Sequence, residues 1–415
     1  MASPPDFRAS LREHSVGALS RMRGDHTRSI LAVLRRVRPL MATRAFGYVT
    51  LADDVLEVLS DFEHFGVPAY NERMTEISGP FILGLDDTDL YGHDHRALRA
   101  AIRAEDLPML AERTLSIARR HVRASAGRLD VVRELADPTI DEVIGAYFGT
   151  PGPDGGVQVR WARDIFAHIF LNVGASAAVR ERALAAADQM RPHLDAQIAA
   201  RRDELKEGHR VPDDVLARLL RDPPREGGLR DIAVRHNLIG LIAGWIPTAS
   251  KAFACAVDEI LRRPPVLERV RRAAREGDHE TMWRCLLEAL RFQPQTWALL
   301  RTCVGDHTVA AGTRRATRFR AGSRVLVATQ SAMFDSRRVA DPRSYRVDRP
   351  LEDYLHFGHG LHACFGREIN RVHLPAMATA LFEGPPVTRA DTGRGLQYDG
   401  AYPASLPVQF APGPV

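Results

Sequence analysis

A glycine-punctuated cysteine loop near the C-terminal end is the feature that most constrains this chain. Residues 357–366 read Phe-Gly-His-Gly-Leu-His-Ala-Cys-Phe-Gly, and a helix-forming run follows at once. Gly358 and Gly360 permit tight backbone turns that a side chain would forbid, and Gly366 lets backbone N–H groups approach the sulfur of Cys364. A helix that begins beside the sulfur favours a thiolate. Such a thiolate suits axial ligation of haem iron; the alternative is a buried structural cysteine in a turn.

The loop resembles the haem-binding loop of the cytochrome P450 family, whose pattern is Phe-Gly-x-Gly-x-His-x-Cys-x-Gly. All six fixed positions are filled in register from Phe357 to Gly366, and Phe357 is expected to exclude water from the loop. The resemblance implies a mainly α fold, with small β-sheets and a long central helix over the haem. It also implies haem b as cofactor, with Cys364 as the ligand of its iron.

Length and composition agree with an intracellular enzyme. The 415 residues can bury one large core or two ordinary ones, and the resemblance implies a single domain over residues 1–415, with residues 1–50 partly irregular. The four cysteines show no paired spacing, which favours a reducing, cytoplasmic setting. We find no secretory signal and no apolar run of about 18 residues, so no membrane association is expected. The net charge of +5 is dispersed and predicts no nucleic-acid partner.

Helical periodicity dominates the chain. The pattern predicts helices over Met109 to Val122, Trp161 to Ala175 and Ala178 to Asp203, and short strands over Ser323 to Ala328 and Leu406 to Phe410. Segments rich in Pro and Gly, at 150–156 and 222–228, read as surface loops.

A Glu-Arg pair precedes the cysteine loop. Glu288 and Arg291 lie three residues apart and can pair on one helix face. By the family resemblance, such a pair is buried and braces the cysteine loop, usually with an arginine from a later segment. Ser344 stands at the place of that arginine, so Arg343 or Arg346 is expected to substitute.

Two histidines and two arginines are candidates to hold the haem propionates, because buried carboxylates require charge-assisted donors. His95 and Arg99 are spaced four apart on one helix face, and they match the family's His-x-x-x-Arg. Arg301 and His362 match two further propionate partners. His93 is the weaker alternative to His95, because no arginine follows it four residues later.

The central helix, expected over Arg235 to Arg262, departs from the family. Ala243 and Gly244 match the small pair at which the helix opens for oxygen. An acid and a threonine should follow, to deliver the protons that let the O–O bond break. This chain has Ile246, which carries no proton, and Pro247, which removes a backbone donor and kinks the helix.

Two interpretations of this missing relay remain. In the first, dioxygen is still activated, with waters, Thr248 or a polar substrate group carrying protons; Thr248 is expected on another side of the helix. In the second, the oxidant is peroxide or a weak O–O or N–O bond of the substrate. Pro247 resembles the proline of peroxide-using fatty-acid hydroxylases of the superfamily, but Ile246 replaces their carboxylate-binding arginine. We favour hydroxylation or epoxidation, with ferredoxin and ferredoxin reductase as electron donors.

The resemblance also outlines a substrate pocket, lined by Trp245, Thr296, Trp297, Leu299 and Tyr402, under a mobile lid formed by Phe65 to Phe81. Its aromatic residues suit a small hydrophobic or aromatic specialised metabolite. The alternative from another class is a haem-thiolate gas sensor or haem carrier. We expect an enzyme, because no output domain is visible.

Overall fold

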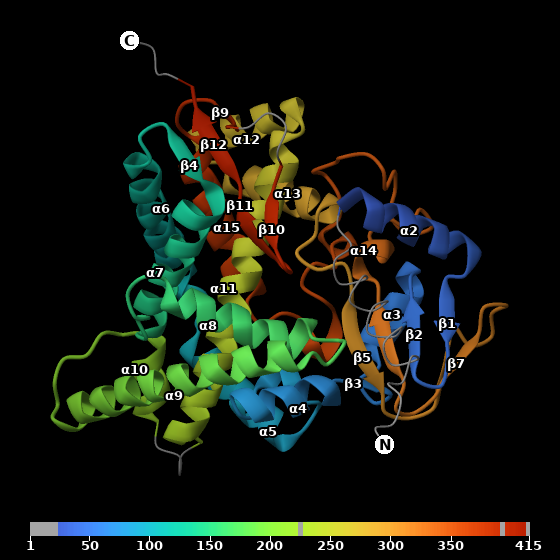
Figure 1. The fold of residues 1–415 in the computed structure, drawn as a ribbon, viewed down its shortest axis with the longest axis horizontal. Helices are drawn as coiled ribbons and strands as arrows, with labels where there is room; N and C mark the ends of the chain where they lie inside the picture. The colour runs from blue at the N-terminus through green and yellow to red at the C-terminus, as the bar shows by residue number, and fades with distance from the viewer. Residues whose placement is uncertain (1–23, 223–226, 391–394, 412–415) are drawn as a thin grey trace, which may run out of the picture.

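The computed structural model describes residues 24–222, 227–390 and 395–411, and helices make up most of it (Figure 1). The helices are α2 (Gly24–Val37), α3 (Ala52–Ser60), α4 (Pro68–Ile77), α5 (Asp89–Ala101), α6 (Leu107–Ala124), α7 (Asp137–Phe148), α8 (Val157–Phe166), α9 (Ala177–Lys206), α10 (Val215–Arg221), α11 (Asp231–Leu261), α12 (Pro264–Glu276), α13 (His279–Phe292), α14 (Thr329–Ala332) and α15 (Arg367–Phe382). The predicted mainly α fold is confirmed.

The largest sheet lies beside the helical body, with α2 and α3 next to it (Figure 1). Its strands run in the order β1 (Leu40–Ala42), β2 (Phe46–Val49), β8 (Arg324–Val327), β5 (Leu299–Cys303) and β3 (Phe65–Gly66). Within this sheet β2 and β8 are parallel, and the other described pairs are antiparallel.

The smaller sheets bring distant segments together. A three-stranded sheet joins β4 (Arg128–Asp130), β12 (Pro407–Phe410) and β9 (Val387–Arg389). Two hairpins pair β6 (His307–Val309) with β7 (Thr317–Phe319), and β10 (Gln397–Asp399) with β11 (Tyr402–Ser405). The β10–β11 hairpin reaches the middle of the helical body, near α11 (Figure 1).

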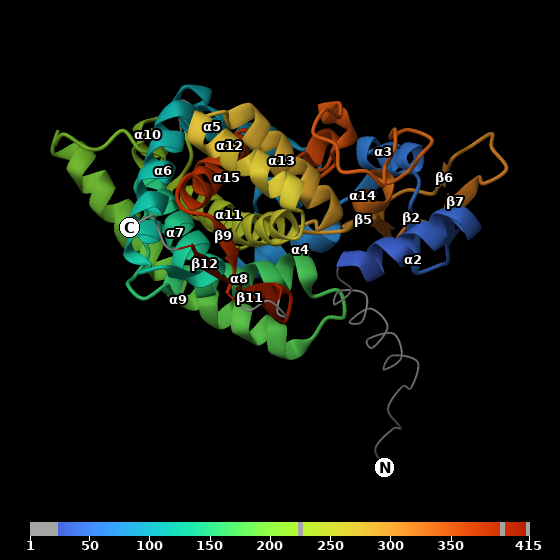
Figure 2. The same ribbon diagram turned by 90° about the horizontal axis from the view of Figure 1, so that it is seen from above.

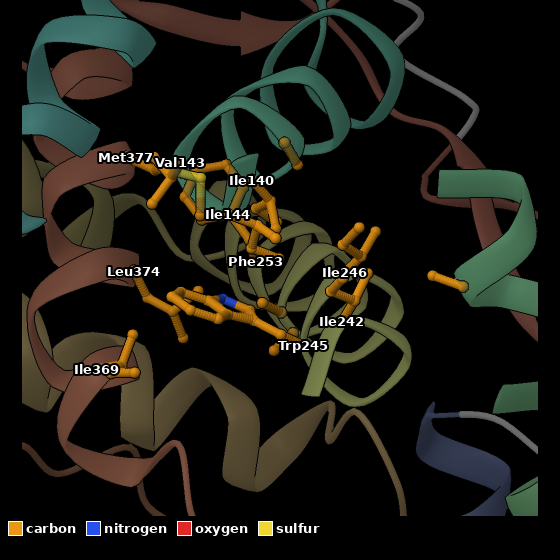
Figure 3. Packing of buried hydrophobic residues seen from close by; sticks show 14 of the residues in the cluster. Ile140, Val143, Ile144, Ile242, Trp245, Ile246, Phe253, Ile369, Leu374 and Met377 are labelled. Carbon is orange, nitrogen blue, oxygen red and sulfur yellow. The ribbon is translucent and has the colours of Figure 1, made fainter. Parts of the chain in front are cut away.

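Helix α11 crosses the middle of the helical body, with α8, α13 and α15 packed around it (Figure 2). By length and composition it could span a membrane, but two thirds of its most apolar window is buried inside the protein, as expected of a core helix. Ile242 and Ile246 of α11 belong to the same buried core as Ile140 and Ile144 of α7 (Figure 3). Pro247 lies inside the helix without ending it.

The predicted elements fall close to the observed ones, with one difference. The segments predicted at 109–122, 178–203, 323–328 and 406–410 are α6, α9, β8 and β12. The helix expected over 161–175 ends earlier, because α8 stops at Phe166 and a π-helical turn follows over Ala167–Leu171. There the Asn172 side chain accepts a hydrogen bond from the backbone N–H of Ser176 and donates one to the Ser176 carbonyl. These side-chain bonds replace the backbone bonds of a helix.

The N-terminal segment is more regular than expected where it is described. Residues 24–50 carry α2, β1 and β2, while residues 1–23 lie outside the described part. Part of the predicted loop at 222–228 also lies outside it. That residues 1–415 form a single domain stays a prediction.

Candidate active site

The cysteine loop adopts the tight turns that its glycines allow. Gly358 and Gly360 have φ of 67° and 70°, in the left-handed region that favours glycine. A Cβ on Gly360 would also lie 2.4 Å from the carbonyl oxygen of Leu59, at the end of α3. The Cys364 N–H donates to the Phe357 carbonyl (2.7 Å), and α15 begins three residues after the sulfur-bearing residue. The loop is therefore fixed against both α3 and α15.

The electrostatics of Cys364 differ from the prediction in one respect. Burial raises the pKa of the thiol, and the backbone N–H of Gly366 with the charges of Arg367 and Arg99 offset this only in part. The start of α15 alone thus does not keep the sulfur ionised. A metal ion bound to the sulfur would displace the proton outright.

The Glu-Arg pair is fully buried on α13 and contacts the segments that lead to the loop. Arg291 donates to both carboxylate oxygens of Glu288 (2.9 and 2.7 Å), and both side chains are 0% exposed. One helical turn of α13 also touches the loop directly, since the Leu287 carbonyl lies 2.9 Å from Nε2 of His356 and Trp283 stacks on Phe357. Burial would raise the pKa of Glu288, but the hydrogen bonds and charge of Arg291 outweigh it and lower that pKa.

The third partner of this pair is Arg349, and the expectation for Arg343 or Arg346 was wrong. Arg349 is 3% exposed, and its Nε donates to Glu288 at 3.2 Å. Arg346 gives Glu288 only its backbone N–H (2.9 Å), while its side chain pairs with Asp341 and Asp348 at the surface. The guanidinium of Arg349 also donates to backbone carbonyls of the segment that starts at Ala340. This segment folds so that Arg349, and not an arginine nearer in sequence to Ser344, reaches the carboxylate of Glu288.

His95 and Arg99 lie on α5 beside the cysteine loop. Arg99 sits over the ring of Phe365, 4.0 Å from its centroid, and the His95 ring meets the same ring edge-on at 5.6 Å. Tyr91, one turn earlier on α5, stacks on His95 and donates its hydroxyl to the Leu361 carbonyl. Sequence reasoning missed Tyr91, although its spacing of four residues from His95 marks the same helix face.

Arg301 and His362 both lie near the carboxylate of Asp86. Nε2 of His362 lies 3.3 Å from the Asp86 carboxylate, and the Asp86 charge also acts on Arg301. Nδ1 of His362 is buried without a hydrogen-bond partner among the described residues. Arg301 is 4% exposed, and burial lowers its pKa, yet guanidinium stays charged. Its acceptor in the described part of the chain is the Leu300 carbonyl, at 3.0 Å.

The accessible face of α11 runs through residues spaced three or four apart. Gly244, Thr248 and Lys251 are half-buried, while Ala243, Trp245, Ile246 and Pro247 are buried. A Cβ on Gly244 would meet no atom within 4 Å. The Thr248 hydroxyl donates to the Gly244 carbonyl at 2.5 Å, so this threonine shares the face of Gly244.

A large cavity of about 1430 Å³ opens next to this face. It meets α11 at Lys251, and its walls come from the segment between α8 and α9, from residues 293–298 and from the β10–β11 hairpin. Thr296, Trp297 and Tyr402 are among its lining residues. The lining includes neither Cys364 nor the four candidate propionate partners.

Two residues predicted for the pocket lie elsewhere. Trp245 packs edge-on against Phe148 and His373 in the core, directed toward α15 (Figure 3). Successive residues of a helix point about 100° apart, so Trp245 lies on a different side of α11 from Gly244. Leu299 begins β5 and lies against Gly358 of the cysteine loop. In the segment expected to form a lid, Tyr70 lines the cavity, whereas Phe65 and Phe81 are buried; its mobility stays a prediction.

These surroundings fit a haem group. Haem requires an axial ligand and partners for two carboxylates. Cys364 offers the sulfur. Nδ1 of His362 has no hydrogen-bond partner among the described residues, and the described acceptor of the buried Arg301 guanidinium is the Leu300 carbonyl, so both groups can bind a carboxylate. His95 and Arg99 lie beside Phe365, next to the sulfur-bearing residue.

Comparisons with known proteins point the same way. Residues 164–383 match the family model of cytochrome P450. The chain is 26% identical over 392 residues to the mycinamicin IV hydroxylase/epoxidase of Micromonospora griseorubida, covering 90% of this chain and 91% of that protein. It is 25% identical over 291 residues to a steroid C26-monooxygenase of Mycolicibacterium smegmatis, covering 69% and 68%.

Among solved structures, the crystal structure of CalO2 is similar, with a TM-score of 0.77 at 25% identity over 93% of this chain and 96% of that one. The family model, the sequence relatives and the similar fold all indicate the same family. The chain thus belongs to the cytochrome P450 family, as a haem b enzyme of the monooxygenase type.

Proposed function

We propose that this protein inserts an oxygen atom, by hydroxylation or epoxidation, into a bulky and largely apolar specialised metabolite. Cys364 is the iron ligand in this proposal, and His95, Arg99, Arg301 and His362 hold the haem carboxylates. Bound haem supplies the iron that activates dioxygen. Ferredoxin and ferredoxin reductase are the electron donors we propose, in the cytoplasm.

The observation that carries the proposal is the hydroxyl of Thr248 on the accessible face of α11. A proline at 247 has no N–H to give the Ala243 carbonyl four residues earlier. One residue later, the Thr248 hydroxyl donates to the Gly244 carbonyl (2.5 Å). A hydroxyl held in this way keeps its lone pairs available to accept a hydrogen bond from water. It can therefore hold a proton-carrying water beside Gly244, where a Cβ would meet no atom within 4 Å.

The cavity supports the substrate class. Its volume of about 1430 Å³ exceeds the roughly 300–1,000 Å³ usual for small-molecule sites, which favours a bulky substrate over the small one expected from sequence. Tyr70, Phe170, Trp297 and Tyr402 offer aromatic surface. Gln293 and Gln330 also line the cavity, and the side-chain carbonyl oxygen of each is buried without a partner among the described residues. Hydroxyl or amine groups on the substrate would satisfy them.

A second candidate function is chemistry that uses no dioxygen, such as peroxide-driven oxidation or rearrangement of a substrate O–O or N–O bond. The complete burial of Ile246 supports it, since the acid position of the family relay points into the apolar core. For the same reason, an acid introduced at 246 would be a buried charge and is expected to destabilise the fold rather than restore a relay.

One experiment separates the two functions. A metabolite that shifts the haem absorption spectrum on binding is incubated with the enzyme and labelled dioxygen, with ferredoxin, its reductase and NAD(P)H, and the product is analysed by mass spectrometry. The proposal predicts label in the product and none formed anaerobically. It also predicts that Thr248→Val uncouples NAD(P)H use from product, while Thr248→Ser, which retains the hydroxyl, does so less. Full turnover without dioxygen and reductant would refute monooxygenation.

A further inference from the structure

Three metal-ligating side chains gather outside the haem site, at the end of α3. Asp61 follows the last residue of α3, His64 lies between α3 and β3, and His307 begins β6. One ligand atom from each lies within 4.8 Å of the others. The three residues are half-buried, so a hydrated ion can reach them.

The contacts of His307 define which of its nitrogens faces the other two residues. Its Nε2 lies 3.2 Å from Oε1 of Glu57, whose other oxygen accepts the backbone N–H of Ala310 (3.0 Å). A carboxylate is an acceptor only, so Nε2 carries the proton. Nδ1 of a neutral His307 then presents a lone pair toward Oδ2 of Asp61, at 3.5 Å. These two electron-rich atoms lie close enough to ligate one cation together.

His64 completes the group. Its Nδ1 lies 2.8 Å from Oδ2 of Asp61, and its ring centroid is 4.6 Å from that of His307. Its side chain is 37% exposed, so its proton can move to Nε2, which solvent satisfies. Nδ1 then becomes a ligand atom. Two imidazole nitrogens and one carboxylate oxygen thereby converge, with water free to take a fourth position.

We propose that Asp61, His64 and His307 bind a divalent transition metal of the zinc class, with Glu57 orienting His307. Imidazole and carboxylate ligands suit zinc, and a histidine whose second nitrogen donates to a carboxylate is the usual outer shell of such sites. Asp61 and Glu57 together balance the charge of the ion.

The position of the site gives it a structural consequence. The metal would link the end of α3 to the β6–β7 hairpin. The backbone of Leu59 and Ser60, directly before Asp61, is the surface against which Gly360 of the cysteine loop packs. The metal is therefore expected to stabilise the support of the loop without touching the haem.

The test uses the untagged holoenzyme, stripped of loosely bound metal with a chelator. Equilibrium dialysis against zinc, with both zinc and iron counted, should give one zinc per chain. His64→Ala and His307→Ala should each weaken binding by at least about tenfold, and Glu57→Gln by about ten- to a hundredfold. The matched control is His121→Ala, because His121 pairs with Glu142 at 2.9 Å and is about as exposed as His307, 22% against 24%.

X-ray absorption at the zinc edge of the wild type provides a second readout that does not depend on how a variant folds. The proposal predicts two imidazoles with further N or O ligands at about 2.0 Å. Absence of zinc uptake, equal uptake by the wild type and the His64 and His307 variants, or a spectrum without imidazole would overturn the proposal. Those outcomes would leave His307 as a hydrogen-bonding partner of Glu57 only.

Discussion

Arg349 offers a quantitative test of how the buried Glu-Arg pair is held. Replacing Arg349 by methionine keeps most of its volume but removes the guanidinium that binds Glu288 and the carbonyls of Asp341 and Ser344. Glu288 would keep Arg291, the Tyr354 hydroxyl and the Arg346 N–H. The perturbation therefore removes one charged partner from a buried network that stays otherwise intact.

The expected cost follows from the burial. Arg349 is 3% exposed, and its removal leaves Glu288 and the carbonyls of Asp341 and Ser344 each short of a charged donor, at about 3–5 kcal/mol in all. Unfolding entropy grows with chain length, so at 415 residues about 1 kcal/mol corresponds to ~1 °C in Tm. Arg349→Met should lower Tm by about 3–5 °C. Arg346→Met breaks only surface pairs and should cost under about 1 kcal/mol.

The assay is thermal unfolding of both variants, followed by far-UV circular dichroism and, in parallel, by haem absorption. Arg349→Lys serves as the conservative variant. It keeps the charge but not the planar fork, so it should fall between the wild type and Arg349→Met. Equal losses for Arg349→Met and Arg346→Met, or a larger loss for the latter, would refute the assignment of Arg349 as the third partner.

Three further outcomes are expected. Gly360→Ala should destabilise the cysteine loop and lower haem retention, because φ is 70° and the new Cβ would clash with the Leu59 carbonyl; haem content at equal expression checks this, and a fully loaded variant contradicts it. Arg301→Ala should weaken haem binding by about 1–3 kcal/mol, measured by haem transfer to an acceptor protein, whereas the exposed Arg314→Ala should not. Burial lowers the pKa of His356 to about 4, so the unfolded chain takes up a proton at higher pH than the folded one. The contribution of His356 to stability should be complete above about pH 6.5 and fall by about 3 kcal/mol toward pH 4, and His356→Gln should flatten the decline in stability; an unchanged slope counts against it.

Local patterns carried most of what the sequence could predict. The loop around Cys364 and the pair of Glu288 and Arg291 depend on short spacings, so residue types alone indicate them. Arg349 could not be found in this way, because it reaches Glu288 only through the path of the chain after α14. A family pattern directed attention to Ser344 instead.

The distal side was harder to predict, since it depends on which face of α11 is open. Counting from the family pattern put Trp245 in the pocket. Packing of α7 and α15 buries Trp245 and Ile246, and it leaves Gly244, Thr248 and Lys251 accessible. Asp86 was missed because nothing in its sequence neighbourhood indicates that it meets His362, 276 residues away.

The ferrous-carbonyl spectrum of the wild type and of Cys364→Ser tests the central claim most directly. A thiolate ligand shifts the absorption of this complex to a characteristic long wavelength. We predict that band in the wild type and its loss in Cys364→Ser at comparable haem content. Persistence of the band in the variant would contradict Cys364 as the iron ligand, and with it our account of the site.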